Sequence, residues 1–180
     1  MSNAQRTEGF AGASRCFFQF AARTIPLIVT FIAVLVMALL VFPALPINGE
    51  MIDLKLHYSL ADMQLAMAQY GATGRAVYAL ASPTVDTLFP LFYSTFLAGL
   101  IYRFRPVERF WVTAFLPLVA GAWDLCENAQ ITAMLLQYPG ITVRQVASAS
   151  FFTPTKHLMT ATCILTALVF LAVAALRRNR

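Results

Sequence analysis

Three polar residues with acid–base and hydrogen-bonding chemistry interrupt an apolar run that is long enough to cross a bilayer. Asp124, Glu127 and Asn128 lie within WVTAFLPLVAGAWDLCENAQITAMLL. Because they are three and four residues apart, a helix would place all three side chains on one face. Ionisable groups at membrane depth are costly, so they usually face the bundle interior, find a partner or mark a functional site. Two neighbouring carboxyl groups repel each other, which favours a pair in which one donates a proton and the other accepts it.

A lysine and a further acid from other apolar runs come to the same depth as these residues. Counted from the basic end of each run at about 1.5 Å of rise per residue, Asp86 lies roughly 25 Å up, Asp124 and Glu127 roughly 22 and 27 Å, and Lys156 roughly 31 Å. These depths fall in the outer half of a hydrocarbon core about 30 Å thick. We therefore expect Lys156 within salt-bridge or single-water reach of Asp124 or Glu127, with Asp86 at the rim of the cluster.

Neighbouring side chains add hydrogen-bonding groups at this level. Tyr93 is seven residues from Asp86, so the two lie on nearly the same helix face, and the Tyr93 hydroxyl can donate a hydrogen bond. His157 follows Lys156 about 100° further round a helix, so these two side chains cannot both point straight at the site. We count Tyr93 and His157 among the candidate ligand-binding residues.

The composition of the chain is that of a polytopic membrane protein. Of its 180 residues 59% are hydrophobic and only 12% are charged, and the mean hydropathy is +0.70, well above the values of soluble domains. Four runs approach or exceed the roughly 20 apolar residues that one crossing needs. They cover about 25–45, 84–102, 110–136 and 149–176. The sequence therefore predicts an all-α protein, a four-transmembrane-helix bundle that forms a single domain over residues 1–180.

The basic residues indicate the orientation of these spans. The formal charge is +5, and nine of the 13 lysines and arginines fall into three clusters that flank the apolar runs on alternate sides: Arg6, Arg15 and Arg23; Arg103, Arg105 and Arg109; Arg177, Arg178 and Arg180. By the positive-inside rule these clusters mark cytoplasmic faces. We expect a multi-pass protein of the bacterial inner (plasma) membrane with both termini cytoplasmic. The same distribution argues against nucleic-acid binding, because the charges lie where topological anchors are needed.

The first outside loop carries signals for a helix of its own. Ser59 and Asp62 form a capping box of the S-x-x-D kind ahead of apolar residues at helical spacing, and Gly71 provides a stop. After the turn G-A-T-G, Arg75 and Tyr78 begin a second helical stretch. The sequence predicts a short amphipathic helix over about 59–82 on the periplasmic surface.

The N-terminal segment and the cysteines complete this description. Residues 9–22 carry four phenylalanines and are expected to lie in the cytoplasmic interface, leading into the first span. Cys16, Cys126 and Cys163 show neither a disulfide framework nor metal-ligand spacing. The chain contains no H-E-x-x-H, G-x-S-x-G or D-D-x-x-D motif, so we expect neither a metal site nor a cofactor.

Four sequence stretches together resemble a group of small bacterial four-span membrane proteins to which no activity is assigned. They are Y-S-L-A-D-M…G-A-T-G-R-A-V-Y, V-D-T-L-F-P-L-F-Y, W-D-L-C-E-N and T-P-T-K, and they cover roughly residues 55–160. The shared marks are a G-x-x-G-R-x-x-Y turn, an acid ahead of F-P-x-x-Y, a D-x-x-E-N and a lysine in the last span. The resemblance implies that one constellation contains Gly71, Gly74, Arg75, Tyr78, Asp86, Tyr93, Asp124, Glu127, Asn128 and Lys156.

One function for this constellation is the binding or processing of a polar-headed lipid or amphiphile that enters from the outer leaflet. In this interpretation the catalytic residues are Asp124, Glu127 and Lys156. The residues that contact the ligand are Arg75, Tyr78, Asp86, Tyr93, Asn128 and His157. Arg75 and Lys156 would hold an anionic head group, while Asp124 and Glu127 would exchange a proton. Binding alone and an enzymatic step on the lipid both fit this arrangement.

Two other functions fit the same residues. The acids and Lys156 could form an interhelical ion-pair network that specifies helix register, either in a free-standing protein or homo-oligomer or in an accessory subunit of a membrane complex. A small proton- or ion-coupled carrier also uses intramembrane acids, although 180 residues without an internal repeat is short for that class. If the network is purely structural, the double variant Glu127→Gln with Lys156→Met should fold and keep its cellular role. If these residues form a functional site, the double variant should be stable but inactive.

Overall fold

The computed structural model describes residues 3–178, and this part of the chain folds entirely into helices and connecting loops. The longer helices are α1 (Asn3–Ala21), α2 (Thr24–Val36), α3 (Leu60–Ala81), α4 (Val85–Phe104), α5 (Leu116–Gln137) and α6 (Val143–Arg178). Shorter helical turns are η1 (Met37–Val41), η2 (Phe42–Ala44), η3 (Ile52–Leu54) and η4 (Glu108–Phe115). Arg180, one of the arginines used to predict topology, lies outside the described residues.

Four helical segments are long and apolar enough to cross a membrane. They are Thr24–Val41, Val85–Phe104, Glu108–Gln137 and Val143–Arg178, close to the four predicted runs. The largest difference is the start of the last segment, which begins six residues before the predicted 149. A capping box explains this start, since Gln145 Oε1 accepts from Thr142 N at 2.9 Å and Thr142 Oγ1 accepts from Gln145 N at 3.3 Å. This T-x-x-Q pattern satisfies backbone donors of the first turn.

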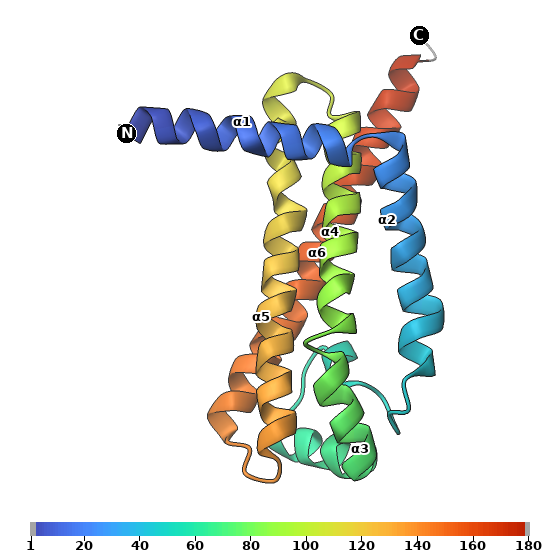
Figure 1. The fold of residues 1–180 in the computed structure, drawn as a ribbon, viewed down its shortest axis with the longest axis vertical. Helices are drawn as coiled ribbons and strands as arrows, with labels where there is room; N and C mark the ends of the chain where they lie inside the picture. Colours follow the sequence, from blue (N-terminus) through green and yellow to red (C-terminus); the bar gives the residue numbers. More distant parts are fainter. Residues whose placement is uncertain (1–2, 179–180) are drawn as a thin grey trace.

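The four long segments run alongside one another, and α1 lies across one end of them (Figure 1). The start of α1 and the end of α6 lie at this end, while α3 and the α5–α6 connection lie at the opposite end. Contacts between distant basic clusters support the arrangement: Arg15 pairs with Glu108 at 3.2 Å and Arg177 donates to Pro106 O at 2.7 Å. The arginines of the three clusters that the structure describes, all but Arg180, therefore lie at one end of the molecule.

Helix α3 contains a break that divides it into two parts. At its start Asp62 N donates to Ser59 Oγ, and Ser59 N donates to Asp62 Oδ2 at 2.8 Å. Ser59 Oγ also donates to Asp62 Oδ2 at 2.6 Å, and this bond, together with the one from Ser59 N, holds the pKa of Asp62 below its ordinary value. At Gly71 the backbone leaves the helix with φ 66° and ψ −179°, a conformation that essentially only glycine adopts. The first part of α3 can therefore lie across the bundle end while the second part leads back toward α4 (Figure 1).

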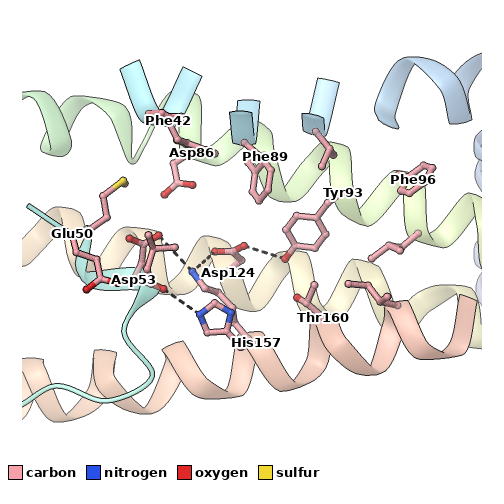
Figure 2. Close-up of a pocket in the computed structure, with 18 of the residues that line it drawn as sticks. Phe42, Glu50, Asp53, Asp86, Phe89, Tyr93, Phe96, Asp124, His157 and Thr160 are labelled. Carbon is pink, nitrogen blue, oxygen red and sulfur yellow. Dashed lines mark hydrogen bonds and ion pairs between the residues drawn. The ribbon is translucent and has the colours of Figure 1, made fainter. Parts of the chain in front are cut away.

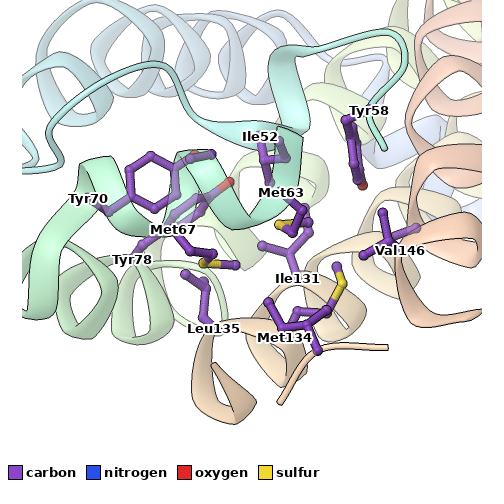
Figure 3. Packing of buried hydrophobic residues seen from close by; sticks show 13 residues of the cluster. Ile52, Tyr58, Met63, Met67, Tyr70, Tyr78, Ile131, Met134, Leu135 and Val146 are labelled. Atoms are coloured by element: carbon purple, nitrogen blue, oxygen red, sulfur yellow. The ribbon is translucent and has the colours of Figure 1, made fainter. Parts of the chain in front are cut away.

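A buried apolar cluster attaches α3 and the preceding loop to the ends of α5 and α6 (Figure 3). We call it the loop-side core; its larger members are Ile52, Tyr58, Met63, Met67, Tyr70, Tyr78, Ile131, Met134, Leu135, Ile141 and Val146. Ile52, from the short turn η3, is completely buried in it. Burial of an isoleucine side chain contributes about 1.5–3 kcal/mol. The loop before α3 is therefore held down onto the bundle at Ile52, and its neighbour Asp53 is held with it.

Candidate functional site

Lys156 of α6 lies at the centre of a buried charge cluster. Its Nζ is 2.6 Å from Glu127 Oε2, 3.3 Å from Asp124 Oδ1 and 3.8 Å from Asp53 Oδ2. All four side chains are buried. The predicted proximity of Lys156 to Asp124 and Glu127 is confirmed, and the structure adds a third acid that lies outside the four membrane-length segments.

Packing between α5 and α6 sets the geometry of this cluster. The ring of Trp123 stacks on Phe152 with centroids 4.4 Å apart, and its Nε1 donates to Phe152 O at 3.2 Å. One residue further along each helix, Asp124 and Thr153 then face inward. Thr153 Oγ1 donates to Glu127 Oε1, so Glu127 bridges α5 to α6 through both Thr153 and Lys156.

Tyr58 extends this network from the loop. Its hydroxyl lies 3.4 Å from Thr153 Oγ1, and its backbone N donates to Ser150 Oγ at 3.2 Å. Burial raises the pKa of Tyr58 to about 12, so the hydroxyl stays protonated at neutral pH. Tyr58 therefore joins the loop to α6 without adding charge to the cluster.

Asp53 is the functional residue that reasoning from the sequence missed. Tyr78 donates its hydroxyl to Asp53 Oδ1 at 2.6 Å, and His157 Nε2 lies 3.3 Å from Asp53 O. Burial raises the pKa of Tyr78 well above its ordinary value, and the nearby Asp53 raises it further, so Tyr78 remains a donor. Depth in the membrane was compared only for residues within the four apolar runs, and Asp53 lies in the loop between the first two runs. The available signal was a single acid inside the short apolar stretch Met51–Leu54.

A cavity of about 640 Å³ opens beside the cluster, between α2, α4, α6 and the loop before η3. Its polar end is formed by Glu50, Asp53, Asp86, Asp124, Lys156 and His157. Its apolar walls include Phe31, Val34, Phe42, Phe89, Phe96 and Ile164. Figure 2 shows the acids gathered at one end and the aromatic rings of α4 continuing away from them. The cavity is therefore amphipathic along its length.

Five of the predicted site residues line this cavity: Asp86, Tyr93, Asp124, Lys156 and His157. Tyr93 donates its hydroxyl to Asp124 Oδ2 at 3.1 Å. Asp124 therefore receives hydrogen bonds from both Tyr93 and Lys156 while facing the cavity. Asp86 lines the cavity but makes no ion pair with Lys156 within the described residues, which agrees with the expected place at the rim of the cluster.

Glu127, Tyr78 and Asn128 lie behind the cavity wall rather than on it. Glu127 is 0% exposed and is separated from the cavity by Lys156. Asn128 Nδ2 donates to Asp86 O at 3.2 Å, which ties α5 to the first turn of α4. These three side chains hold cavity-lining residues in place: Glu127 holds Lys156, Tyr78 holds Asp53, and Asn128 holds the backbone of Asp86.

Arg75, which we expected to hold a head group, is not among the residues that line the cavity. Its guanidinium donates to Met67 O at 2.7 Å and lies 4.4 Å from the centroid of the Tyr138 ring. Met67 lies before the break at Gly71 and Arg75 lies after it, so Arg75 joins the two parts of α3 across the break. Its role in the fold is to stabilise the two parts of α3.

The cluster carries an excess of acid over base. Asp53, Asp86, Asp124 and Glu127 face only the ammonium of Lys156, so complete ionisation would leave four negative charges and one positive charge, a net charge of −3. Buried charges are costly unless they are paired. The arrangement can hold protons or attract a cation. Within residues 3–178 no group of three or more potential ligands has the geometry of a metal site.

Comparison of the chain with protein-family models, with curated proteins and with solved structures finds no match.

Proposed function

We propose that this protein spans the bacterial inner membrane four times and binds an amphiphile in the cavity, with the polar head at the acid–lysine cluster. The observation that carries the proposal is the cavity itself, whose acidic end continues directly into aromatic and aliphatic walls. Ligand sites are typically concave and mostly apolar, with a few polar groups that fix orientation. A ligand with a polar head and an apolar tail matches both ends of this cavity.

The distribution of basic residues supports one orientation of the protein in the membrane. The described arginines of the three clusters lie at the α1 end, and basic residues favour the cytoplasmic face. In this orientation α1 lies along the cytoplasmic interface and α3 lies on the periplasmic surface. The cavity and the Lys156 cluster then occupy the outer half of the bilayer.

The packing of α2 supports entry of the ligand from the membrane. Helix α2 contacts α1 and α4, whereas within residues 3–178 it has no extensive contact with α5 or α6. The cavity is nevertheless lined by both α2 and α6, through Phe31 and Val34 on one side and Thr160 and Ile164 on the other. A gap between α2 and α6 would let an acyl chain pass sideways without crossing the polar surface of the bilayer.

Asp124 is the group best placed to exchange a proton with a bound head group. It faces the cavity and accepts hydrogen bonds from Tyr93 and Lys156. Glu127 is enclosed behind Lys156, so we assign it a positioning role rather than direct contact with the ligand. Glu127 and Lys156 thus form a structural ion pair, and Asp124 is the acid that faces the ligand.

The proposal is tested by filling the apolar end of the cavity. Val34 lines it, whereas Val36, two residues later on α2, is exposed and does not. The protein is purified in a mild detergent, and the bound amphiphiles are quantified by mass spectrometry of the extract. We expect Val34→Trp to lower the amount of co-purified amphiphile about tenfold, a change of about 1.4 kcal/mol in binding, while Val36→Trp leaves it unchanged.

Both variants must elute as single symmetric peaks, so that a loss of ligand cannot be attributed to unfolding. The proposal fails if wild-type protein carries no amphiphile, or if Val34→Trp and Val36→Trp retain equal amounts. A purely structural ion-pair network would give either result.

A further inference from the structure

Resting on the proposed function, we infer that the head group recognised in this cavity is cationic, a protonated amine or a quaternary ammonium, and that it binds against Asp86 and Asp124. An amphipathic cavity alone would accept a head group of either charge. A cationic head group is the opposite of the anionic one that Arg75 and Lys156 were expected to hold.

The first observation is that no cationic group at the cavity is free to hold an anion. Lys156 has three N–H donors, and three carboxyl groups, those of Asp53, Asp124 and Glu127, lie within 2.6–3.8 Å of its Nζ. Arg75 is held by Met67 O and Tyr138 outside the cavity. The remaining basic group of the lining is His157, whose Nε2 contacts Asp53 O. An anionic head group would therefore meet an excess of carboxylates, and like charges brought together repel.

The second observation is an acid without a protein partner. Asp86 is only 7% exposed, and its carboxyl oxygens make no hydrogen bond or ion pair within the described part of the chain. Figure 2 shows this carboxyl group pointing into the cavity, toward the side on which Asp53 and Asp124 lie. A buried polar group without a partner carries a desolvation cost of about 1–3 kcal/mol, more if it is charged. A cation in the cavity would remove that cost and would balance part of the excess negative charge.

The third observation is the aromatic lining beside Asp86. Phe89 lies one turn further along α4 and packs edge-to-face against Phe42, with ring centroids 5.3 Å apart, and against Tyr93 at 5.5 Å. These three rings line the cavity next to the acids. Ammonium groups are attracted to aromatic faces, most strongly where water is excluded. Acid and aromatic groups together are the chemistry that selects an amine-bearing head.

The test compares three amphiphiles that share one alkyl chain: laurylamine, lauryl alcohol and lauryl phosphate. Binding is measured by titration into protein held in micelles of an uncharged maltoside detergent, with protein-free micelles as the blank. We expect laurylamine to bind at least about tenfold more tightly than either of the other two. Asp86→Asn should lower the affinity for laurylamine about tenfold and leave the affinity for lauryl alcohol unchanged.

Glu108→Gln is the matched control, because it also removes one negative charge but lies at the α1 end in exposed ion pairs with Arg15 and Arg105. It should leave all three affinities unchanged. Tightest binding of lauryl phosphate or of lauryl alcohol overturns the cationic inference while the amphiphile site stands. An unchanged laurylamine affinity in Asp86→Asn also overturns the inference. If none of the three binds above the blank, the inference fails together with the proposed function.

Discussion

At the scale of single residues, the decisive feature is that Lys156 has more acidic neighbours than it can neutralise. Glu127 is its closest partner, at 2.6 Å, and is completely enclosed. Asp124 is further away, at 3.3 Å, and faces the cavity. Two acids on one face of α5 therefore have different surroundings, and only one of them is available to a ligand.

We predict that Lys156→Met alone lowers the free energy of unfolding by about 3–5 kcal/mol, because it leaves buried carboxyl groups without their cation. Combining it with Glu127→Gln should recover a substantial part of that loss, since the most enclosed acid then carries no charge. The measurement is unfolding in mixed micelles of the wild type, both single variants and the double variant, analysed as a double-mutant cycle. Additive effects of the two substitutions would show that the pair is not coupled.

At the scale of helices, close approach between elements depends on small residues at defined positions. Gly99 of α4 lies against the turn between α1 and α2, where an added Cβ would overlap with Ala21 O and lie 2.8 Å from the Ala21 carbonyl carbon. The same Cβ would be 3.0 Å from Leu27 Cδ2. Backbone atoms cannot move aside as the end of a flexible side chain can. The position of α1 across the bundle therefore depends on the absence of a side chain at Gly99.

We predict that Gly99→Ala destabilises the protein by about 1–3 kcal/mol, the usual cost of overpacking. Gly12→Ala is the control, because a Cβ on that α1 residue meets no atom within 4 Å and alanine is the better helix former. Thermal unfolding in detergent, followed by circular dichroism, should show a lower midpoint for Gly99→Ala than for Gly12→Ala. Equal midpoints would contradict the close contact between α4 and the α1–α2 turn.

At the scale of the whole molecule, the start of α1, the end of α6 and the described arginines of the three clusters lie at one end, opposite α3 (Figure 1). We predict that the end carrying α3 is periplasmic. In a variant with Cys126→Ala and Cys163→Ala, a cysteine introduced at the exposed Gln69 of α3 should react with a membrane-impermeant maleimide in intact cells. The native Cys16 of α1, which is also exposed, should react only after the cells are permeabilised.

Cys16 serves as the internal control in this experiment, since it reports on the opposite face of the same molecule. The orientation is wrong if Cys16 is labelled in intact cells and the cysteine at position 69 is protected.

Several features of this protein were determined by local sequence properties. The length of the apolar runs produced four membrane-length helices. The last helix begins before its apolar run because Thr142 and Gln145 cap it there. The periodicity of the helix placed Asp124 and Glu127 on one face. Their distance from the basic end of the span matched that of Lys156, with which both form ion pairs. These properties depend only on residue type and on distance along one helix, so they can be read without knowing how the helices pack.

Only the tertiary structure decided which of these groups meet the cavity. Asp53 reaches Lys156 because Ile52 is buried in the loop-side core, a contact between segments far apart in the chain. Arg75 donates to Met67 O across the break at Gly71 rather than lining the cavity, and Glu127 is enclosed because Lys156 lies in front of it. Spacing along the sequence shows which face of a helix carries a residue, but the neighbours of that face depend on how loops and helices pack in three dimensions.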